Sequence, residues 1–520
     1  MPRIARAFLC LLFASSSLLF AADCSSLKNV ELADTQITLA QTVASGDFET
    51  TSSGMLHNLP PFCRVAAIIR PTSDSKIRFE VWLPVQGWNG RMVGTGNGGF
   101  AGTFYYQQMG PYLKRGFAAV GSDAGHQAEG TDATWAYGHP EKVKDFGWRA
   151  IHLTAERGKQ IIDAYYGKPA HKAYFESCSD GGREGLMEAQ RFPEDYDGIM
   201  AGAPAAAWST GVAAGVRMVQ RLTDPVDYIP DRKLPAIKRA VLAACDRLDG
   251  VKDGIIGDPS QCHFDPQVLL CKHDDELDCL TQPQIETLKL LYAGAKNEQG
   301  VQVSSGLSMG DETGWKDWVI GTDPLQSYGV RYVYNYVRYM VADPKINLLT
   351  ADPDALLRQS MAKEAADLDA TNPDLSRFAA HGGKLILFQG WNDPAIPPGN
   401  TIVYFESVEK QMGADKVAGF ARLYMVPGME HCGLGPGANS FGQYGGKTAA
   451  GPKYGLFDSL ENWVEKGSPL ENVVATHYEP GPNGVVKPTL TRPLCAYPKV
   501  AKYSGSGDTS NAANFACVAP

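Results

Sequence analysis

The feature that most constrains the fold is an alternation of short apolar strands with helical patterns between about residues 76 and 203. Five segments have the length and composition of strands: residues 79–83, 91–95, 117–122, 173–176 and 199–203. Residues 148–165 carry apolar side chains at helical spacing. The strand pattern returns at residues 384–388 and 423–426, and residues 456–464 form an amphipathic helical pattern. This rhythm predicts an α/β fold, a mostly parallel sheet covered by helices.

A chain of 520 residues exceeds the usual size of one domain, so it contains either one large domain with an insertion or two to three domains. Between about Ala205 and Ala380 the strand pattern fades, while Pro, Asp, Cys and aromatic residues accumulate. Because a structureless loop of this length is implausible, we expect a folded lid. The expected parts are a leader, two parts of one α/β domain and the lid between them: residues 1–22, 23–204, 381–520 and 205–380.

The first 22 residues have the pattern of a secretory signal peptide. Arg3 and Arg6 precede an apolar run from Ala7 to Phe20, and the small residues Ala21 and Ala22 follow. The run is short for a membrane-spanning helix, which needs about 20 residues, and no later segment is long and apolar enough. We therefore expect a secreted or periplasmic protein. Its net charge of −9 suits neither nucleic acid nor an anionic membrane, so we expect no partner of either kind.

The chain has 11 cysteines, and because Cys10 lies in the leader, an even number remains. In an exported chain this indicates disulfides rather than free thiols or a zinc site. None of the short cysteine spacings is C-x-x-C, which further weakens the zinc hypothesis.

A candidate nucleophile lies in the stretch ESCSDGGREGL, residues 176–186. Ser179 follows a predicted strand and precedes a segment, residues 183–190, that can begin a helix. A nucleophile elbow requires this order, because the sharp turn lifts the hydroxyl above the sheet and points helix-terminal N–H groups at the reacting oxygen. Ser177 replaces the first glycine of the G-x-S-x-G pattern, so the stretch taken alone also fits a serine that caps a helix.

Two further residues supply the partners that a catalytic serine needs, a base and a carboxylate that orients it. Asp393, in QGWNDP, follows the strand at residues 384–388, and His431, in VPGMEHCG, follows the strand at residues 423–426. An isolated Asp or His in a loop is usually just solvated. The prediction rests on their combination, because Ser, Asp and His occur in the order typical of α/β-hydrolases and at strand ends.

A cysteine stands next to the nucleophile and another next to the base. Cys178 precedes Ser179, and Cys432 follows His431. If the two sulfurs are bonded, their Cα atoms lie within about 7 Å, which places the two catalytic side chains next to each other. The alternative, two independent structural bridges, requires both residues to have acquired an adjacent cysteine by coincidence.

The CS…D…HC arrangement resembles the tannase and feruloyl esterase family of secreted α/β-hydrolases, over nearly the whole chain after the leader. The matching elements are the CSDGG elbow at residues 178–182, GNGG at residues 96–99, Asp393, and His431 with Cys432. The resemblance implies an α/β-hydrolase fold with an inserted lid and a serine carboxylesterase that hydrolyses small esters of aromatic acids such as gallate and ferulate, of plant cell-wall or tannin origin. Tannase or terephthalate monoester hydrolysis is an alternative, and a catalytically inactive binding module on the same scaffold is the alternative from another class.

The loop GTGNGG, residues 94–99, matches G-x-G-x-x-G, and Asp123 ends a later strand, which together fit a dinucleotide site. An exported protein lacks a supply of nicotinamide cofactor, and no strong helical pattern follows residues 100–106, so we expect no organic cofactor. The family resemblance instead makes this loop half of an oxyanion hole. N–H groups of Gly98 or Gly99 and of Asp180 would then face the developing charge, and each donor contributes about 3 kcal/mol.

Residues 246–255, DRLDGVKDGI, gather three carboxylates among glycines. Calcium prefers hard oxygen ligands, but the spacing is not that of an EF-hand, and an acidic surface turn is the ordinary interpretation. The resemblance implies a structural Ca²⁺ ion that stiffens the lid. Its ligands would be the Asp246, Asp249 and Asp253 side chains and the Val251 and Ile255 carbonyls.

An aromatic-rich stretch, residues 315–339, lies late in the lid, and we expect it to pack mostly in the lid's own core with one or two rings facing the site. Ile396, just after Asp393, is a candidate wall of the acid pocket. Sequence nearness and the family resemblance together predict four further disulfides: Cys24 with Cys63, Cys245 with Cys262, Cys271 with Cys279, and Cys495 with Cys517.

Overall fold

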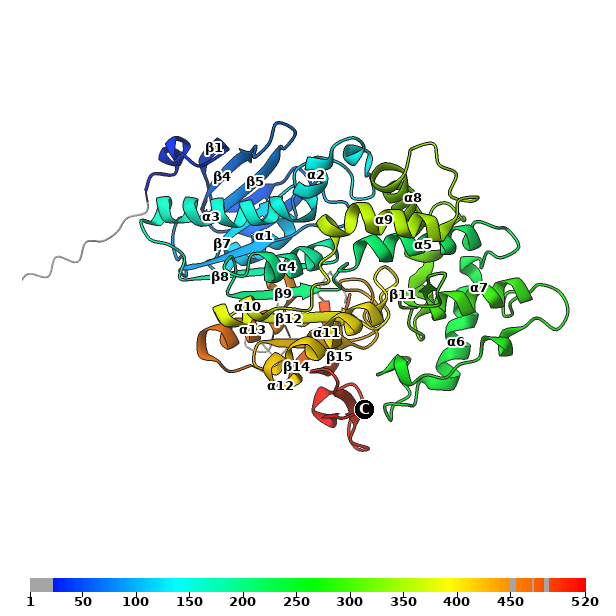
Figure 1. Cartoon of the computed structure of the whole chain (residues 1–520). Helices are drawn as coiled ribbons and strands as arrows, with labels where there is room; N and C mark the ends of the chain where they lie inside the picture. Colours follow the sequence, from blue (N-terminus) through cyan, green and yellow to red (C-terminus); the bar gives the residue numbers. More distant parts are fainter. Residues whose placement is uncertain (1–21, 447, 449–454, 470–471, 481–485) are drawn as a thin grey trace, which may run out of the picture.

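The computed structural model describes residues 22–446, 448, 455–469, 472–480 and 486–520, so the predicted leader lies outside the described residues except for Ala22. One sheet of nine strands runs through the molecule (Figure 1). In spatial order its strands are β1 (Thr35–Val43), β4 (Phe62–Ile69), β5 (Ile77–Pro84), β7 (Ala118–Ser122), β6 (Arg91–Thr95), β8 (Lys172–Cys178), β9 (Gly198–Gly202), β12 (Lys384–Gly390) and β13 (Ala421–Val426). From β7 to β13 neighbouring strands are parallel, whereas β1, β4, β5 and β7 pair antiparallel.

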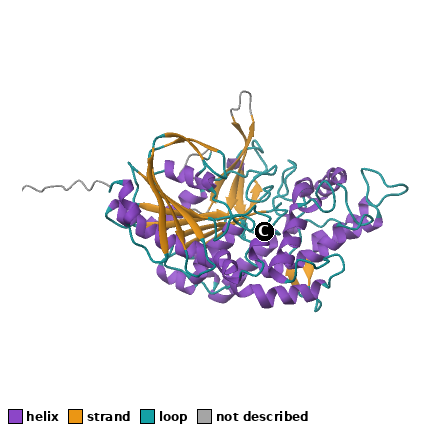
Figure 2. Cartoon of the chain, turned by 90° about the horizontal axis from the view of Figure 1, so that it is seen from above, coloured by secondary structure: helices purple, strands orange, loops and turns teal. Residues whose placement is uncertain are grey.

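Helices cover both faces of this sheet (Figures 1 and 2). On one face α3 (Ala150–Tyr166), α4 (Asp180–Arg191) and α11 (Pro398–Met412) share an apolar core with the strands. On the other face α1 (Tyr106–Lys114) and α13 (Leu456–Lys466) pack into a second core. Every residue of β7 and β9 is buried, as expected for strands between two helix layers. The predicted α/β class is confirmed.

Two parts of the N-terminal region differ from the sequence expectations. The antiparallel strands β1 and β4 were not expected, and β1 contains only one buried residue because it forms an edge of the sheet, which leaves no apolar alternation to detect. The expectation that no helix follows residues 100–106 is wrong, because α1 begins at Tyr106. Pro111 lies inside α1 and weakens its helical signal. α1 begins seven residues after Gly99, whereas in a dinucleotide site the helix opens directly at the glycine loop.

The chain between β9 and β12 is mostly helical. It comprises α5 (Trp208–Leu222), α6 (Leu234–Cys245), α7 (Gln282–Ala293), the ribbon of β10 (Ala295–Lys296) and β11 (Gln302–Ser304), α8 (Tyr328–Tyr336), α9 (Pro353–Leu368) and α10 (Ser376–His381). Side chains of α6 and α7 form a separate apolar core, whereas those of α5, α8 and α9 join the main core. The predicted insertion, residues 205–380, thus has an inner part merged with the sheet domain and an outer part with its own core, seen at the end of the molecule in Figure 1.

Short elements complete the fold. The helices are α2 (Pro140–Lys144) and α12 (Ala414–Ala418), and the hairpins are β2 (Gly46–Glu49) with β3 (Met55–Leu59), β14 (Asn472–Pro480) with β15 (Val486–Cys495), and β16 (Val500–Tyr503) with β17 (Phe515–Val518). The three hairpins were not expected from the sequence. In the described part of the chain, no helix combines the length and the apolar character needed to cross a bilayer.

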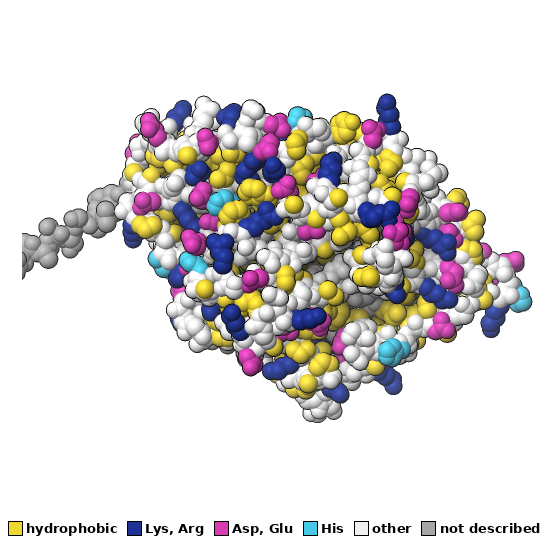
Figure 3. All heavy atoms as spheres, viewed as in Figure 1, with side chains coloured by type: hydrophobic (Ala, Val, Ile, Leu, Met, Phe, Trp, Pro, Cys, Tyr) yellow, Lys and Arg dark blue, Asp and Glu magenta, His cyan; other side chains and the backbone are white. Residues whose placement is uncertain are grey.

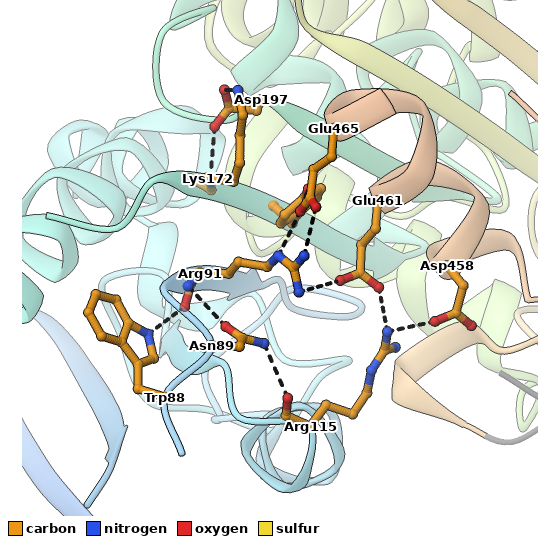
Figure 4. A network of polar contacts seen from close by, with 11 residues as sticks. Trp88, Asn89, Arg91, Arg115, Lys172, Asp197, Asp458, Glu461 and Glu465 are labelled. Carbon is orange, nitrogen blue, oxygen red and sulfur yellow. Dashed lines mark hydrogen bonds and ion pairs between the residues drawn. The ribbon is translucent and has the colours of Figure 1, made fainter. Parts of the chain in front are cut away.

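Charged side chains fix α13 against the sheet (Figure 4). Arg115, just after α1, donates to Asp458 at 2.7 Å and to Glu461 at 2.5 Å. Arg91, at the start of β6, donates to both oxygens of Glu465 at 2.6 and 2.7 Å. Burial raises the pKa of Glu461 to about 7, although the two guanidinium groups oppose the shift. Elsewhere, acidic and basic side chains are interspersed over the face seen in Figure 3, where neither sign forms a continuous field.

Candidate active site

Ser179 occupies the sharp turn between β8 and α4. Its φ of 67° and ψ of −122° form a conformation that is rare for a residue with a side chain. Its N–H donates to the Gly202 carbonyl at 2.9 Å, and its carbonyl accepts from the Arg183 N–H at 3.1 Å. A Cβ on Gly182 would lie 2.2 Å from the Gly202 carbonyl oxygen, so only glycine fits there. The predicted strand, turn and helix around Ser179 are therefore present.

His431 lies between Ser179 and Asp393. Its Nε2 is 2.9 Å from the Ser179 hydroxyl, and its Nδ1 is 2.9 and 3.1 Å from the two Asp393 oxygens. With the proton on Nδ1, the ring donates to the carboxylate and leaves Nε2 free to accept the serine proton. The side chain of Asp393 is fully buried, whereas that of His431 keeps 11% of its area exposed.

Four donors surround the buried Asp393 carboxylate. Besides His431, the backbone N–H groups of Ala395 and Ile396 donate to Oδ1 at 2.8 and 2.9 Å, and the Gln389 amide donates to Oδ2 at 2.9 Å. The amide oxygen of Gln389 in turn accepts from the Thr401 hydroxyl at 2.8 Å. These bonds compensate the buried charge and fix the orientation of the carboxylate toward the imidazole.

A disulfide joins the neighbours of the candidate nucleophile and the candidate base. Cys178 and Cys432 are bonded, with Cα atoms 5.9 Å apart, across a sequence separation of 254 residues. The other four disulfides join the same pairs that the sequence analysis expected. The site is thus assembled from two distant parts of the chain that one covalent link holds together.

The glycine loop lies beside this centre. Gly99 and Ser179 line the same cavity, and the carbonyl of Asn97 accepts the Gly181 N–H at 2.8 Å, which ties the loop to the start of α4. Asp180 is the first residue of α4, so its N–H is one of the helix-terminal donors without an intrahelical acceptor. The carboxyl of Asp180 points away and binds Arg183 at 2.7 Å, and burial raises its pKa. The three candidate oxyanion residues are therefore brought together.

A cavity of about 810 Å³ opens over Ser179 between the sheet domain and the insertion. Ile396 lines it from the loop after Asp393, and Trp318 and Tyr332 line it from the insertion. The Trp318 ring contacts His431 edge to face, with ring centroids 5.0 Å apart, and stacks near Tyr332 at 5.9 Å. The lining is predominantly apolar, and it includes many alanines and glycines that leave room for a planar group.

The aromatic stretch divides as expected between packing and the cavity. Trp315 and Tyr336 are buried in the apolar cores, whereas Trp318 and Tyr332 face the cavity. The sequence did not indicate which rings would do so, because helical spacing alone does not say which side of α8 meets the site.

The acidic loop gathers hard oxygen groups, although among the described residues its three carboxylates do not all come within 4.8 Å of one another. One oxygen of each carboxylate accepts backbone N–H groups of the loop, and Asp253 also pairs with Arg492 at 2.5 Å. Burial raises the pKa of Asp246, and it raises that of Asp249 to about 6, with the charge of Asp253 adding to both shifts. Such mutual repulsion among hard oxygen donors is what a divalent cation relieves. Cys245, bonded to Cys262, immediately precedes the loop.

Two polar residues that support the site were not singled out from the sequence. Gln389 lies near the end of the apolar strand β12 and binds Asp393, and Glu184 lies on the buried helix α4 and binds the glycine loop. The signal in both cases is a polar side chain at a position that the predicted packing buries. Neither follows a recognised motif spacing, so the contacts emerge only from the fold.

In α/β-hydrolases, a serine at the elbow forms a hydrogen bond with a histidine that follows a later strand, as Ser179 does here with His431. The sheet with helices on both faces also has the architecture of this class. Within that class the chain belongs to the tannase and feruloyl esterase family, whose model matches residues 63–518.

Known proteins resemble the chain over nearly its full length. It is 38% identical over 530 residues to an uncharacterized esterase of Xanthomonas campestris pv. campestris, with 96% of this chain and 91% of the relative covered. It is 32% identical over 539 residues to the mono(2-hydroxyethyl) terephthalate hydrolase of Piscinibacter sakaiensis, with 89% and 85% covered. The crystal structure of feruloyl esterase B from Aspergillus oryzae matches with a TM-score of 0.89 and 28% identity, covering 96% and 100%. The chain is therefore a carboxylic ester hydrolase.

Proposed function

We propose that the protein is a secreted serine esterase that hydrolyses small esters of aromatic acids through an acyl-enzyme. The observation that carries this proposal is a pair of hydrogen bonds, one from Ser179 to His431 and one from His431 to Asp393, each 2.9 Å long. The apolar cavity with Trp318 and Tyr332 beside it supports an aromatic acid as the acyl group.

The proposed reaction has two steps, and His431 carries the proton in both. It takes the Ser179 proton as the hydroxyl oxygen bonds to the ester carbonyl carbon, then gives that proton to the leaving alcohol as the ester C–O bond breaks. In the second step a water molecule loses a proton to His431 and attacks the acyl carbon. The bond to Ser179 breaks, Ser179 regains its proton and the free acid leaves.

N–H groups from two segments would stabilise the oxyanion in both steps. Gly98 and Gly99 belong to the glycine loop, and Asp180 follows the nucleophile directly. Donors fixed in place before the reaction lower the barrier because they need no reorganisation, and the loss of one donor typically reduces kcat about 10²- to 10³-fold.

Three further features belong to this proposal. Asp246, Asp249 and Asp253 with the Val251 and Ile255 carbonyls would hold a Ca²⁺ ion, which supplies structural cross-linking and takes no part in the reaction. Residues 205–380 would act as the lid that forms the outer wall of the substrate cavity. Export of the chain is supported by the leader pattern and by the five disulfides.

The direct test is Ser179→Ala assayed with methyl ferulate, methyl gallate and mono(2-hydroxyethyl) terephthalate. We expect kcat to fall more than about 10⁴-fold for every ester that the wild type cleaves, with circular dichroism unchanged. The relative kcat/KM values of the wild type identify the preferred acid, and the relatives named above favour ferulate and terephthalate esters. Unchanged turnover by the variant would rule out the serine mechanism, and a wild type inactive on aromatic and p-nitrophenyl esters would favour a binding module.

A further inference from the structure

We propose that Glu184 is a positioning residue, whose side-chain oxygen holds the glycine loop of the oxyanion hole against the nucleophile helix. This inference rests on the proposed function, because it concerns how the two halves of that oxyanion hole stay aligned. Glu184 lies on α4, beyond the elbow, and it touches neither the cavity residues nor the catalytic hydroxyl in the described contacts.

The glycine loop is attached to α4 by hydrogen bonds at Asn97. Its N–H donates to Glu184 Oε2 at 2.9 Å, and its carbonyl accepts from the Gly181 N–H at 2.8 Å. Its side-chain amide donates to the carbonyls of Thr103 and Ser122 at 3.0 and 2.9 Å. Both backbone groups of this one residue are therefore bonded to the helix that carries the nucleophile, directly before Gly98 and Gly99.

The packing around Glu184 leaves no room for another arrangement. A Cβ on Gly96 would lie 2.3 Å from Glu184 Oε2 and 2.8 Å from the Gly181 Cα, so the loop and α4 touch through glycines. Glu184 is 1% exposed and Asn97 is also 1% exposed. Water cannot replace the carboxyl as acceptor, and without Glu184 the Asn97 N–H would be buried with no partner.

The surroundings of Glu184 favour the neutral form of its carboxyl. Burial, and then the neighbouring Asp180 carboxyl, raise its pKa well above the usual value, while Arg183 opposes the shift. The Arg183 guanidinium is committed to Asp180 and to the carbonyls of Phe146 and Gly147. A neutral carboxyl accepts an N–H through its carbonyl oxygen, and the amide of a glutamine offers the same atom in the same place.

Glu184 would affect catalysis by keeping the glycine loop aligned with α4. The Asp180 N–H belongs to α4 and the Gly98 and Gly99 N–H groups belong to the loop, so the hole keeps its shape only while these two segments stay in register. A displacement of about 1 Å costs up to about 10²-fold in rate. Such a loss falls on kcat, because the oxyanion exists only in the transition state and the intermediate.

The test compares Glu184→Leu with Glu184→Gln on the ester that the wild type cleaves best. We expect Glu184→Leu to lower kcat about 10- to 100-fold with KM within about threefold of wild type. It should also weaken inhibition by an aryl boronic acid, whose adduct with serine places an oxygen in the hole. Glu184→Gln restores the acceptor and should recover both values to within about threefold, because only the carbonyl oxygen is required.

Glu188→Leu is the matched control for a general loss of packing. Glu188 lies one turn further along α4, is 0% exposed and also has a pKa raised well above the usual value by burial, but it is not bonded to the loop. All rates are expressed per folded molecule from thermal melts. Equal kcat losses in the Glu188 and Glu184 leucine variants, a wild-type kcat in Glu184→Leu, or a Glu184→Gln kcat reduced more than about tenfold would each overturn the inference.

The Ser179→Ala variant separates this inference from the proposed function. If Ser179→Ala is inactive while Glu184→Leu keeps wild-type kcat, only the positioning role fails. If Ser179→Ala keeps its activity, the proposed function fails first. Should Glu184→Leu not fold, Glu184→Met, which keeps the length of the side chain without its acceptor, takes its place in the same comparison with Glu184→Gln.

Discussion

The catalytic centre and the outer part of the insertion are cross-linked in opposite ways. At the centre, one disulfide joins residues 254 positions apart, and the catalytic hydrogen bonds connect β8, β12 and β13 strand ends. In the outer insertion, the disulfides Cys245–Cys262 and Cys271–Cys279 span only 17 and 8 positions. The insertion therefore holds its own local shape, whereas the centre depends on links between segments that the chain does not keep together.

This difference indicates what each cross-link does. Closing a loop of 254 residues removes about 5.5 kcal/mol of chain entropy from the unfolded state, and closing one of 8 removes about 2.5 kcal/mol, in the simple entropy model. Only the long link also joins the neighbours of the proposed nucleophile, Ser179, and its proposed base, His431. We therefore expect its loss to affect activity and the loss of a short link to affect stability alone.

Among the variants that test this comparison, we expect the largest loss of kcat for the double variant Cys178→Ser with Cys432→Ser. At 25 °C and per folded molecule, kcat should fall about 10- to 100-fold, because His431 is no longer held within reach of Ser179. Esterase assays with thermal melts measure both properties. Cys271→Ser with Cys279→Ser is the matched control, and we expect its kcat to stay within about twofold. If both pairs lost kcat equally, the long disulfide would have no special role in alignment.

Calcium removal should affect the stability of the protein and leave its catalytic rate nearly unchanged. Ca²⁺ at about 100 times its Kd contributes about 2.7 kcal/mol to the folded state, so EGTA should lower the melting temperature by a few degrees. We expect kcat at 25 °C to change less than about twofold, since none of the expected calcium ligands lines the cavity. Asp249→Asn should melt at the same temperature with Ca²⁺ as with EGTA. A wild-type melting temperature unaffected by both reagents would contradict the calcium proposal.

The smallest effect is expected at Glu430, where the catalytic centre meets the insertion, and it concerns the pH dependence of stability. Glu430 precedes His431 and packs against Gly314 of the insertion. Burial, and then the Asp311 charge, raise its pKa to about 7. The folded state thus keeps a proton that the unfolded state loses near pH 4.5, so this stabilisation is full below that pH and disappears as the pH rises through about 7.

Urea unfolding at pH 5, 6, 7 and 8 measures this linkage. The free energy of unfolding of wild type, relative to Glu430→Gln, should fall by about 1 kcal/mol from pH 5 to pH 8, a value reduced because the side chain is only half-buried. Glu276→Gln, at an exposed position of the insertion, serves as the control with no pH trend. A constant difference between wild type and Glu430→Gln across this range would show that the carboxyl is not perturbed by the contact.

Much of the sheet domain was predictable, because its central strands are buried on both faces and read as short apolar runs. The strand expected at residues 91–95 coincides with β6, and each expected strand overlaps an observed one. The edge strand β1 and the hairpin β14–β15 left no such signal, because few of the residues of β1 and β14 are buried. The site residues were found because Ser179, Asp393 and His431 follow strand ends in a fixed order.

The supporting contacts were beyond the sequence for a different reason. Glu184 meets Asn97 across 87 positions, and Trp318 meets His431 from the insertion, so neither contact leaves a local periodicity. The pairing of Cys178 with Cys432 was the exception. It was foreseeable because each cysteine adjoins a residue whose chemistry requires the other.

The glycines at the elbow set limits on how this enzyme can be altered. A methyl group on Gly181 would lie 2.1 Å from the Ser177 hydroxyl, and one on Gly182 would collide with the main chain at Gly202. Random mutagenesis should therefore return almost no tolerated change at these two positions, whereas the cavity wall contributed by the insertion should accept many. Directed evolution toward bulkier or more polar esters would do best to leave the elbow untouched and diversify that wall.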